Sequence, residues 1–413
     1  MRIAWVGPTP NADGGAPYVG TQLLRELARA GAEIDCFLDV GRDQIPPALL
    51  GLDGLGFVLR PTRWRWGSWY NRTPLRAFVS GKLFRLRAQF ALAKTIADRH
   101  ADTPYDVVYQ FSQSELGALR SQRGRLPPIV VHPSTHAAGE LRWHKREAAF
   151  ARAIEPRGRR ALVRAVLTAR AAIQRRELAH ADRILSISRR FAHYLAADYG
   201  IPQDRIGIVI NPIDLERFCP NGRKPSPPGP LTLLFVSRIA VRKGVELVVD
   251  LSHRLDDLHG EVELVVIGGP STWSDYRKLL DDLNPRIARY LGNVAPDDLA
   301  HRYRGALALL APSQYEPFAL TVGEALAGGT PVIVSDEVGA ADGIDPRVCK
   351  VFPRGDRGAF ERAVREAIAA ADSIPRALAR AEAERLFAPA TVAATLLAEL
   401  EQARLATDHP RAG

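Results

Sequence analysis

Short apolar runs alternate with longer amphipathic stretches along most of the 413-residue chain. In the first half, the runs RIAWVG, IDCFLDV, YDVVYQFS and PIVVHPS predict buried strands. The stretch between the first two predicts an amphipathic helix with Val19, Leu23, Leu24 and Leu27 on one face. The second half continues the pattern with LTLLFVSR, VELVVIG, LALLAPS, TPVIVS and CKVFP. Strands rich in Val, Ile and Leu that alternate with helices are typical of parallel sheets covered on both faces.

The length and one linker predict two such domains. A chain of 413 residues exceeds one ordinary domain, and CPNGRKPSPPGP at 219–230 is rich in Pro and Gly. We therefore expect an α/β fold with two Rossmann-like, doubly wound domains that face a central cleft. In such sheets the ligand lies at the carboxyl ends of the strands, so the functional site is expected in that cleft.

The composition favours a globular protein that neither spans a membrane nor depends on disulfides. Apolar residues make up 46% and charged residues 25% of the chain, as in ordinary folded domains. No apolar run approaches the roughly 18 residues of a membrane span, and the N-terminal apolar run is too short for a signal peptide. Cys36, Cys219 and Cys349 lie far apart, and we expect them to be reduced and buried in a cytoplasmic protein.

The net charge of +10 comes from the first half of the chain. Residues 1–200 contain 31 Lys/Arg against 17 Asp/Glu, whereas residues 201–413 contain 25 against 29. Two segments without acidic residues, 54–97 and 157–176, hold nine and seven basic residues. The first segment interleaves them with aromatic residues, among them Trp64, Trp66, Trp69, Tyr70, Phe78 and Phe84.

This mixture of arginine and tryptophan suits an anionic membrane surface or a phosphate-bearing acceptor. Two solvated helix faces with their aromatic residues in the core give the same pattern. No nucleic-acid-binding fold accompanies the basic segments, so we expect no nucleic-acid partner.

The stretch EPFALTVGEALAGGTPVIV places two glutamates around the start of a predicted helix. The preceding run is a buried strand, so Glu316 lies in the loop at its carboxyl end, and Glu324 follows on the helix. A helix N-terminus binds anions, while a carboxylate accepts hydrogen bonds from two vicinal hydroxyls. A nucleotide sugar supplies hydroxyls, diphosphate and ribose together, so the pair favours such a ligand over two solvated helix-start glutamates.

Two cations follow another strand at the same predicted edge. In FVSRIAVRKGVELVV the strand ends at Val236, and Arg238 and Lys243 lie in the loop before a helix. Cations at the carboxyl end of a parallel strand bind phosphates, and arginine offers a bidentate fork, although two surface cations would look the same. Gly14 and Gly15 precede the first helix and allow the backbone to approach a ligand closely.

These motifs together resemble the retaining glycosyltransferases of family 4, which have the GT-B fold. EPFALTVGEALAGGTPVI is similar to that family's paired-glutamate motif, and SRIAVRKG resembles its G-R-x-x-x-x-K-G segment, with Ser237 in place of the usual glycine. IVINPIDLERF resembles the segment that leads into the second domain, without its usual Pro-Asn-Gly. LFAPATVAATLLAEL resembles the terminal helix that crosses back. The resemblance implies an acceptor-side domain at 1–203, a donor domain at 204–395, and a helix or tail at 396–413 that packs on the first domain.

The resemblance also implies roles for individual residues. Glu316 would bind hydroxyls of the donor sugar, and Glu324 those of the ribose. Arg238 and Lys243 would stabilise the negative charge that grows on the departing diphosphate. The other donor-binding residues would be Gly14 and Gly15, Phe318, Ala319 and Leu320 through their backbone N–H groups, and Gly292, Asn293 and Val294 beside the nucleobase. The family needs no metal ion or cofactor, and the sequence has no Asp-x-Asp triplet and no His/Cys cluster with ligand spacing.

One histidine is expected near the reaction centre. The run PIVVH predicts a buried strand, so the residues after it emerge at the cleft. The family often has a histidine here, and His136 fits best, whereas His132 and His144 fit structural roles. The acceptor side would then be lined by Glu140, Arg142 and Trp143.

The sequence therefore predicts a retaining hexosyltransferase that moves a sugar from a UDP- or GDP-sugar to an acceptor hydroxyl. The basic first domain favours a lipid-linked or membrane-surface glycan acceptor, and a cytoplasmic bacterial protein peripheral to the inner membrane face. A soluble natural-product acceptor is the alternative. A sugar-nucleotide epimerase on the same fold and a non-catalytic GT-B binding module are further alternatives, although the intact set of acids and cations fits transfer better.

Overall fold

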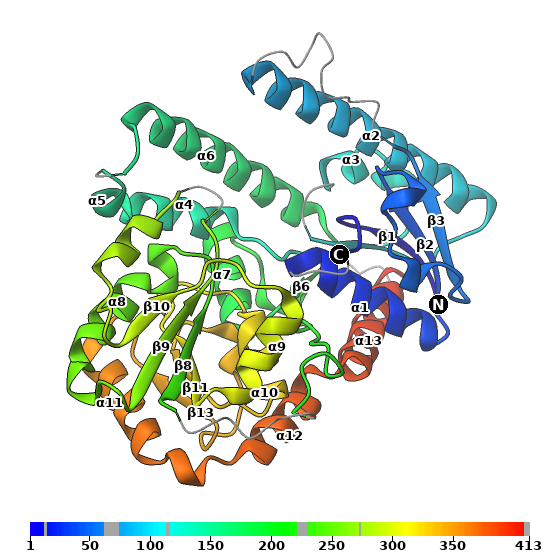
Figure 1. Ribbon diagram of the computed structural model, residues 1–413. Coiled ribbons are helices and arrows are strands. Elements are labelled where there is room, and N and C mark those ends of the chain that lie inside the picture. Colours follow the sequence, from blue (N-terminus) through cyan, green and yellow to red (C-terminus); the bar gives the residue numbers. More distant parts are fainter. Residues whose placement is uncertain are drawn as a thin grey trace.

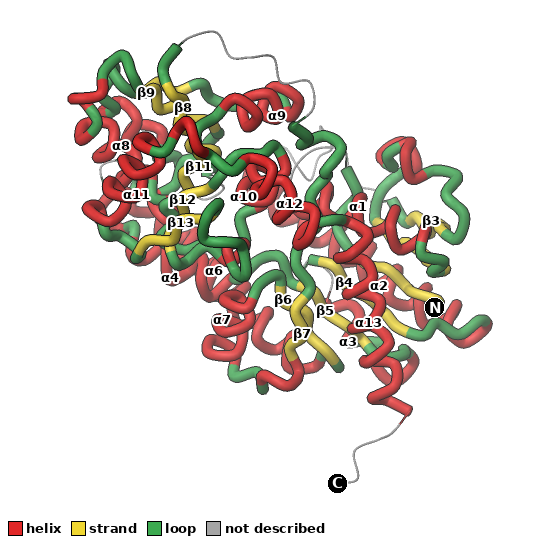
Figure 2. The backbone as a smooth tube through the Cα atoms, turned by 90° about the horizontal axis from the view of Figure 1, so that it is seen from below, coloured by secondary structure: helices red, strands yellow, loops and turns green. Residues whose placement is uncertain are grey.

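Two parallel β-sheets, each surrounded by helices, form two domains (Figure 1). The computed structural model describes residues 1–11, 15–61, 74–112, 116–152, 154–220, 229–271 and 274–408. Figure 2 shows the sheets as separate layers, each with helices around it. Buried apolar side chains fill the space between each sheet and its helices, and one core cluster includes residues of both domains.

The first sheet has seven parallel strands in the order β3-β2-β1-β4-β5-β6-β7. Its strands are β1 Arg2–Val6, β2 Glu33–Leu38, β3 Leu55–Leu59, β4 Val107–Phe111, β5 Ile129–His132, β6 Arg183–Ser186 and β7 Ile206–Ile208. Its helices are α1 Gly15–Arg29, α2 Pro74–Asp102, α3 Leu116–Arg120, α4 Ala137–Arg146, α5 Ala148–Ala151, α6 Arg157–His180 and α7 Arg189–Tyr199. The predicted apolar face of α1 is confirmed, because Val19, Leu23, Leu24 and Leu27 are all buried.

The second sheet has six parallel strands in the order β10-β9-β8-β11-β12-β13. Its strands are β8 Leu231–Val236, β9 Val262–Ile267, β10 Ala288–Tyr290, β11 Ala308–Ala311, β12 Val332–Ser335 and β13 Cys349–Phe352. Its helices are α8 Val245–Arg254, α9 Pro296–Gly305, α10 Leu320–Ala327, α11 Arg357–Ala369 and α12 Arg376–Phe387.

Both sheets reverse their strand order beside the first strand. Strand β1 lies between β2 and β4, and β8 lies between β9 and β11. This reversal defines a doubly wound sheet and leaves a crevice at the carboxyl ends of the strands. The predicted fold class of two doubly wound α/β domains is therefore confirmed.

The chain returns to the first domain after the second is complete. Helix α13, Pro389–Asp408, lies beside α1 (Figure 1). Its buried side chains, Val392, Leu396 and Leu400 among them, share one core cluster with β1 and α1. Where the outgoing and returning segments pass each other, the Ile213 N–H donates to the Phe387 carbonyl over 2.9 Å.

Strand β7 pairs with β6 and so belongs to the first sheet, although it follows the expected boundary after residue 203. A three-residue strand carries too weak an apolar pattern to be recognised in the sequence. We propose that the first domain comprises the chain through β7 together with α13, which begins before the expected tail at 396–413.

Other expectations concern the membrane and the cysteines. No helix in the described ranges combines the length and apolarity that a membrane span requires. Cys36 and Cys349 are buried as expected, whereas Cys219 is only partly buried. The aromatic residues Trp64, Trp66, Trp69 and Tyr70 and the side chain of Phe78 lie outside the described residues.

The packing of α13 is tested by two leucines on the same helix. Leu396 is fully buried, whereas Leu405 is 50% exposed. We expect Leu396→Ala to lower the free energy of unfolding by about 2–5 kcal/mol, because a buried cavity remains, and Leu405→Ala by less than about 0.5 kcal/mol. Urea unfolding followed by circular dichroism compares the two. Equal stability of both variants would show that α13 does not complete the core of the first domain.

Candidate active site

A cavity of about 720 Å³ lies between the two domains. Residues within two positions of the carboxyl ends of parallel strands form part of its wall, including Ser134 after β5, Ser237 after β8 and Ser313 after β11. This is the edge at which doubly wound sheets bind ligands, and the volume suits a small-molecule substrate. The cleft expected from the sequence is therefore present.

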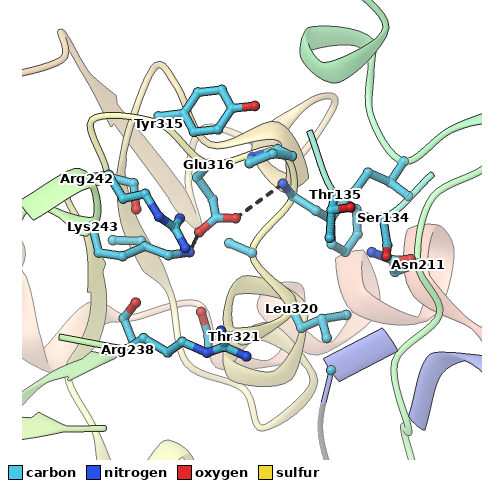
Figure 3. Close-up of a pocket in the computed structure, with 18 of the residues that line it drawn as sticks. Ser134, Thr135, Asn211, Arg238, Arg242, Lys243, Tyr315, Glu316, Leu320 and Thr321 are labelled. Carbon is cyan, nitrogen blue, oxygen red and sulfur yellow. Dashed lines mark hydrogen bonds and ion pairs between the residues drawn. The ribbon is translucent and has the colours of Figure 1, made fainter. Parts of the chain in front are cut away.

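The cavity is cationic at one end and neutral at the other (Figure 3). The cationic end is formed by Arg238, Arg242 and Lys243. The neutral end is formed by Ser134, Thr135 and Asn211. The cationic end therefore suits phosphate groups, and the hydroxyl and amide groups of the neutral end suit a ligand that carries hydroxyls.

The Lys243 ammonium contacts the Glu316 carboxylate (Figure 3). Burial, followed by the nearby guanidinium groups of Arg242 and Arg238, lowers the pKa of Lys243, while the carboxylate favours its charged form. Arg238, Arg242 and Lys243 thus line this end of the cavity together, and Lys243 forms an ion pair with Glu316. Positive charge gathered in a partly buried site favours the binding of an anion.

The loop from β11 to α10 brings Glu316 to the cavity. The Phe318 N–H donates to its carboxylate over 3.5 Å, and the predicted helix follows as α10. Ala319, at the N-cap of α10, has a left-handed φ of 81°, which costs a residue with a Cβ roughly 1–2 kcal/mol. No side chain caps the helix at this residue, although the Val322 N–H donates to the Ala319 carbonyl. Leu320 and Thr321 line the cavity, so the N-terminus of α10 lies where it can bind an anion.

Glu324 lies about one turn further along α10, outside the lining of the cavity. Its carboxylate accepts a hydrogen bond from the Tyr303 hydroxyl over 3.0 Å. Burial raises the pKa of Glu324 to about 7, although Tyr303 and the charge of Arg217 act in the opposite direction. The carboxyl group is therefore ionised above this pH and protonated below it.

The expected nucleobase segment also lies outside the cavity lining. Gly292, Asn293 and Val294 follow β10, and Gly292 has a left-handed φ of 69°. The Asn293 side chain lies against Gly269, where an added Cβ would come within 2.8 Å of its amide oxygen. The donor-binding candidates thus form two groups, one inside the cavity and one beyond it on the second domain.

His136 lines the cavity, but its side chain is fully buried. Its Nδ1 lies 2.5 Å from the Tyr315 hydroxyl, and its Nε2 lies 3.0 Å from the Asp198 carboxylate. Burial raises the pKa of Asp198, but the contacts with His136 and Arg142 outweigh burial and lower it. The ring is also surrounded by Phe191, Tyr194 and Tyr199. Nδ1 therefore has a hydrogen-bond partner and Nε2 an ion-pair contact, and the contact with Tyr315 joins the two domains.

The three acceptor-side candidates have different surroundings. Glu140 lines the cavity and forms an ion pair with Arg170 at 3.5 Å. Arg142 bonds Asp198, and Trp143 is buried; neither belongs to the cavity lining.

Of the other candidate residues in the first domain, only some line the cavity. Gly15, with a φ of 72°, begins α1 and lines the cavity, whereas Gly14 lies outside the described residues. His132 bonds Tyr109 over 2.7 Å inside the core, and burial lowers its pKa to about 4. His144 lies 3.2 Å from a backbone carbonyl of α6.

Several cavity residues escaped the sequence analysis: Ser134, Thr135, Asn211, Arg242 and Tyr315. Ser134 and Thr135 closely follow a strand that the sequence predicts, and Arg242 directly precedes Lys243. Their positions in the sequence could therefore have placed them at the cleft. Asn211 and Tyr315 carried no such signal, because their place in the cavity depends on how the two domains meet.

Ser237 stands where the family motif has glycine, and its backbone carbonyl lies against Gly268. Gly268 has a φ of 141°, and a Cβ there would overlap the Ser237 carbonyl. The close approach of these two strand ends therefore depends on Gly268.

Comparison with known proteins follows this geometry. The family model "Glycosyl transferase 4-like domain" matches residues 13–212, and "Glycosyl transferases group 1" matches residues 221–384. A D-inositol 3-phosphate glycosyltransferase 1 from Catenulispora acidiphila is 27% identical over 365 residues, which cover 83% of this chain and 79% of that protein.

Two solved structures have the same architecture. Sucrose-phosphate synthase from Thermosynechococcus elongatus superposes with a TM-score of 0.69 at 18% identity, covering 98% of this chain and 100% of that chain. Anabaena HepE in complex with UDP-glucose superposes with a TM-score of 0.64 at 15% identity, covering 97% and 100%. These two likenesses show the GT-B fold, and the two family models define a glycosyltransferase of that class. Within that class, the chain belongs to family 4.

Proposed function

We propose that the chain is a retaining hexosyltransferase that moves a sugar from a UDP- or GDP-sugar to an acceptor hydroxyl without a metal ion. The observation that carries this proposal is that Arg238, Arg242, Lys243 and Glu316 line one cavity beside the N-terminus of α10, with Lys243 paired to Glu316. The related fold of HepE holds UDP-glucose, which supports a uridine nucleotide as the first donor to test.

The three cations would bind the diphosphate and stabilise the charge that grows on it as the glycosidic bond breaks. Fixed cations stabilise the transition state, in which this charge has grown, more than they stabilise the ground state. The activation barrier is therefore lower. The N–H groups of the first turn of α10 would add to this stabilisation. Because cations already supply the positive charge that a metal ion would otherwise bring, we expect transfer to proceed in the presence of a chelator.

Retention is supported by the state of the candidate bases. Among the described residues that line the cavity, Glu316 is paired with Lys243, Glu140 is paired with Arg170, and His136 has partners at both nitrogens. The departing phosphate is then the group available to accept the proton of the acceptor hydroxyl. Attack would occur on the face that the leaving group vacates, which preserves the anomeric configuration.

The two glutamates would divide the hydroxyls of the donor. Glu316, next to Lys243, would accept hydrogen bonds from the sugar, and Glu324 would accept them from the ribose. The backbone of Phe318, Ala319 and Leu320 and the segment from Gly292 to Val294 would hold the diphosphate and the base, respectively.

The acceptor would enter from the neutral end of the cavity, and we propose that a lipid-anchored molecule at the membrane surface provides it. Helix α2 presents Leu83, Leu86 and Phe90 at 55%, 45% and 44% exposure, with the exposed Arg87 and Lys94 on the same face. Leucine and phenylalanine beside lysine and arginine, with no acid between them, suit an anionic lipid surface.

A soluble acceptor is the alternative. The relatives named as D-inositol 3-phosphate glycosyltransferases support a small polyol phosphate within that alternative.

Transfer and its dependence on the ion pair are tested together. The protein is incubated with UDP-glucose or GDP-mannose, candidate acceptors and EDTA, and nucleoside diphosphate release is measured. We expect release with one donor, and a loss of at least about 10²-fold in Glu316→Ala and in Lys243→Ala, with unchanged circular dichroism. Lys278→Ala, an exposed lysine outside the cavity, is the control. Full activity in either site variant would remove that residue from the site, and inactive wild-type protein would favour a non-catalytic binding module.

The raised pKa of Glu324 predicts a pH dependence of nucleotide affinity. Only the ionised carboxylate accepts bonds from both ribose hydroxyls, so the affinity for UDP should increase from pH 6 to 8, by up to about tenfold per unit below pH 7. Calorimetric titration of Glu324→Gln should therefore show no increase with pH. A persistent increase in that variant would place the titrating group elsewhere.

Membrane binding is tested with vesicles. We expect sedimentation with phosphatidylglycerol vesicles but not with phosphatidylcholine vesicles, and at least about tenfold weaker binding in the double variant Leu86→Glu, Phe90→Glu. Leu405→Glu, an equally exposed leucine on α13, is the control. If the wild-type protein does not bind anionic vesicles at about 0.1 M salt, this result would favour the soluble acceptor.

A further inference from the structure

Helix α4 belongs to the first domain and contacts the second at both ends. It begins after His136 and ends before Glu147, and both flanking residues are buried. At its start, the Nδ1 of His136 lies 2.5 Å from the Tyr315 hydroxyl. At its end, the Glu147 carboxylate accepts the Arg242 backbone N–H over 3.0 Å and the Tyr276 hydroxyl over 2.9 Å. One helix therefore bonds two separate loops of the second domain.

These loops carry the two residues of the ion pair. Arg242 precedes Lys243, and Tyr315 precedes Glu316. The Arg242 carbonyl accepts the N–H groups of Gln314 and Tyr315 over 2.8 and 3.2 Å. The backbone of Arg242 is thus bonded on one side to the first domain and on the other side to the loop of Glu316.

Local packing brings α4 close to both loops. An added Cβ at Gly139 would overlap the Tyr315 hydroxyl, so a glycine is needed for the helix to lie against that side chain. Ala151, on the short helix α5 that follows Glu147, is fully buried in an apolar core cluster of the second domain. This part of the first domain is therefore shaped to fit the second.

We propose that α4, through His136 and Glu147, positions the Lys243 and Glu316 loops when the domains come together, and that Glu147 is a positioning residue for donor binding. Glu147 does not line the cavity. Its carboxylate accepts a hydrogen bond from the backbone N–H of Arg242. This bond fixes the backbone next to Lys243 and so orients the Lys243 side chain. The nature of the ligand rests on the proposed function, whereas the ordering of the loop by Glu147 does not.

Three variants separate this role from a general loss of contact. Glu147→Ala removes both acceptor atoms, and Glu147→Gln keeps a side-chain carbonyl that accepts the Arg242 N–H. Glu337→Gln is the control, because Glu337 is equally buried and its carboxylate also accepts a tyrosine hydroxyl across the domain interface, that of Tyr194. Its other carboxylate partners are the guanidinium groups of Arg190 and Arg354.

The first measurement is hydrogen exchange of the Arg242 amide in the ligand-free proteins, by mass spectrometry of a peptide from Ile239 to Gly244. We expect exchange at least about tenfold faster in Glu147→Ala, and wild-type rates in Glu147→Gln and Glu337→Gln. Wild-type protection in Glu147→Ala, or equal acceleration in Glu337→Gln, would overturn the proposal. Should Glu147→Ala fail to fold, Tyr276→Phe removes one bond to the same carboxylate and should accelerate exchange by about two- to threefold; no acceleration would equally overturn it.

The second measurement is the dissociation constant of UDP by calorimetry, with melting temperatures as the control for folding. We expect UDP to bind about tenfold more weakly to Glu147→Ala, with near wild-type affinity in Glu147→Gln and Glu337→Gln. Faster exchange with unchanged UDP affinity would overturn the link between α4 and the donor. Wild-type protein that binds neither UDP nor GDP would instead overturn the proposed function, and the exchange result would still decide whether Glu147 orders the loop.

Discussion

The placement of Arg238, Arg242 and Lys243 along one wall of the cavity between the domains is the constraint around which the centre of the molecule is organised. Backbone structure holds these three cations in place: the end of β8, a 3₁₀ turn over Val241–Lys243, and the left-handed Gly244 that precedes α8. An added Cβ at Gly244 would overlap the Pro312 carbonyl, so this turn lies directly against the end of β11. The fold thus holds positive charge in place before any anion arrives, which is the form of preorganisation that electrostatic catalysis requires.

The same placement explains why two residues of the site, Glu316 and Lys243, could be predicted from the sequence. Glu316 and Lys243 follow β11 and β8, which are neighbouring parallel strands, and the carboxyl ends of such strands meet at one edge. Alternating apolar runs were enough to predict the two doubly wound sheets and the helix after Glu316. Residue type and position therefore placed this acid and this cation at the same edge of the sheet without any knowledge of how the domains pack, whereas the contact between them is a finding of the structure.

Contacts between the domains were not predictable in this way. His136 has the residue type of a reactive group, yet its partners Asp198 and Tyr315 lie far along the chain, and together they bury the ring. Glu147 carried no signal in the sequence, because its partners are a backbone N–H and a tyrosine of the other domain. The short β7 was also missed, since a strand of three residues is identified by its pairing and not by its pattern. A single sequence records local preferences well and the relative placement of two domains poorly.

The return of α13 to the first domain has a consequence for how the protein is made. Residues Val392 to Ala403 complete a core that begins with Ile3 and Trp5, whereas every strand of the second sheet lies within one continuous stretch, from β8 to β13. During synthesis, domains generally fold as units in the order in which they leave the ribosome. Here the order is inverted: the second domain is complete while the first still exposes the apolar groove that α13 will fill. The nascent first domain must therefore stay soluble through the translation of the whole second domain, which makes that groove a surface for chaperones to cover.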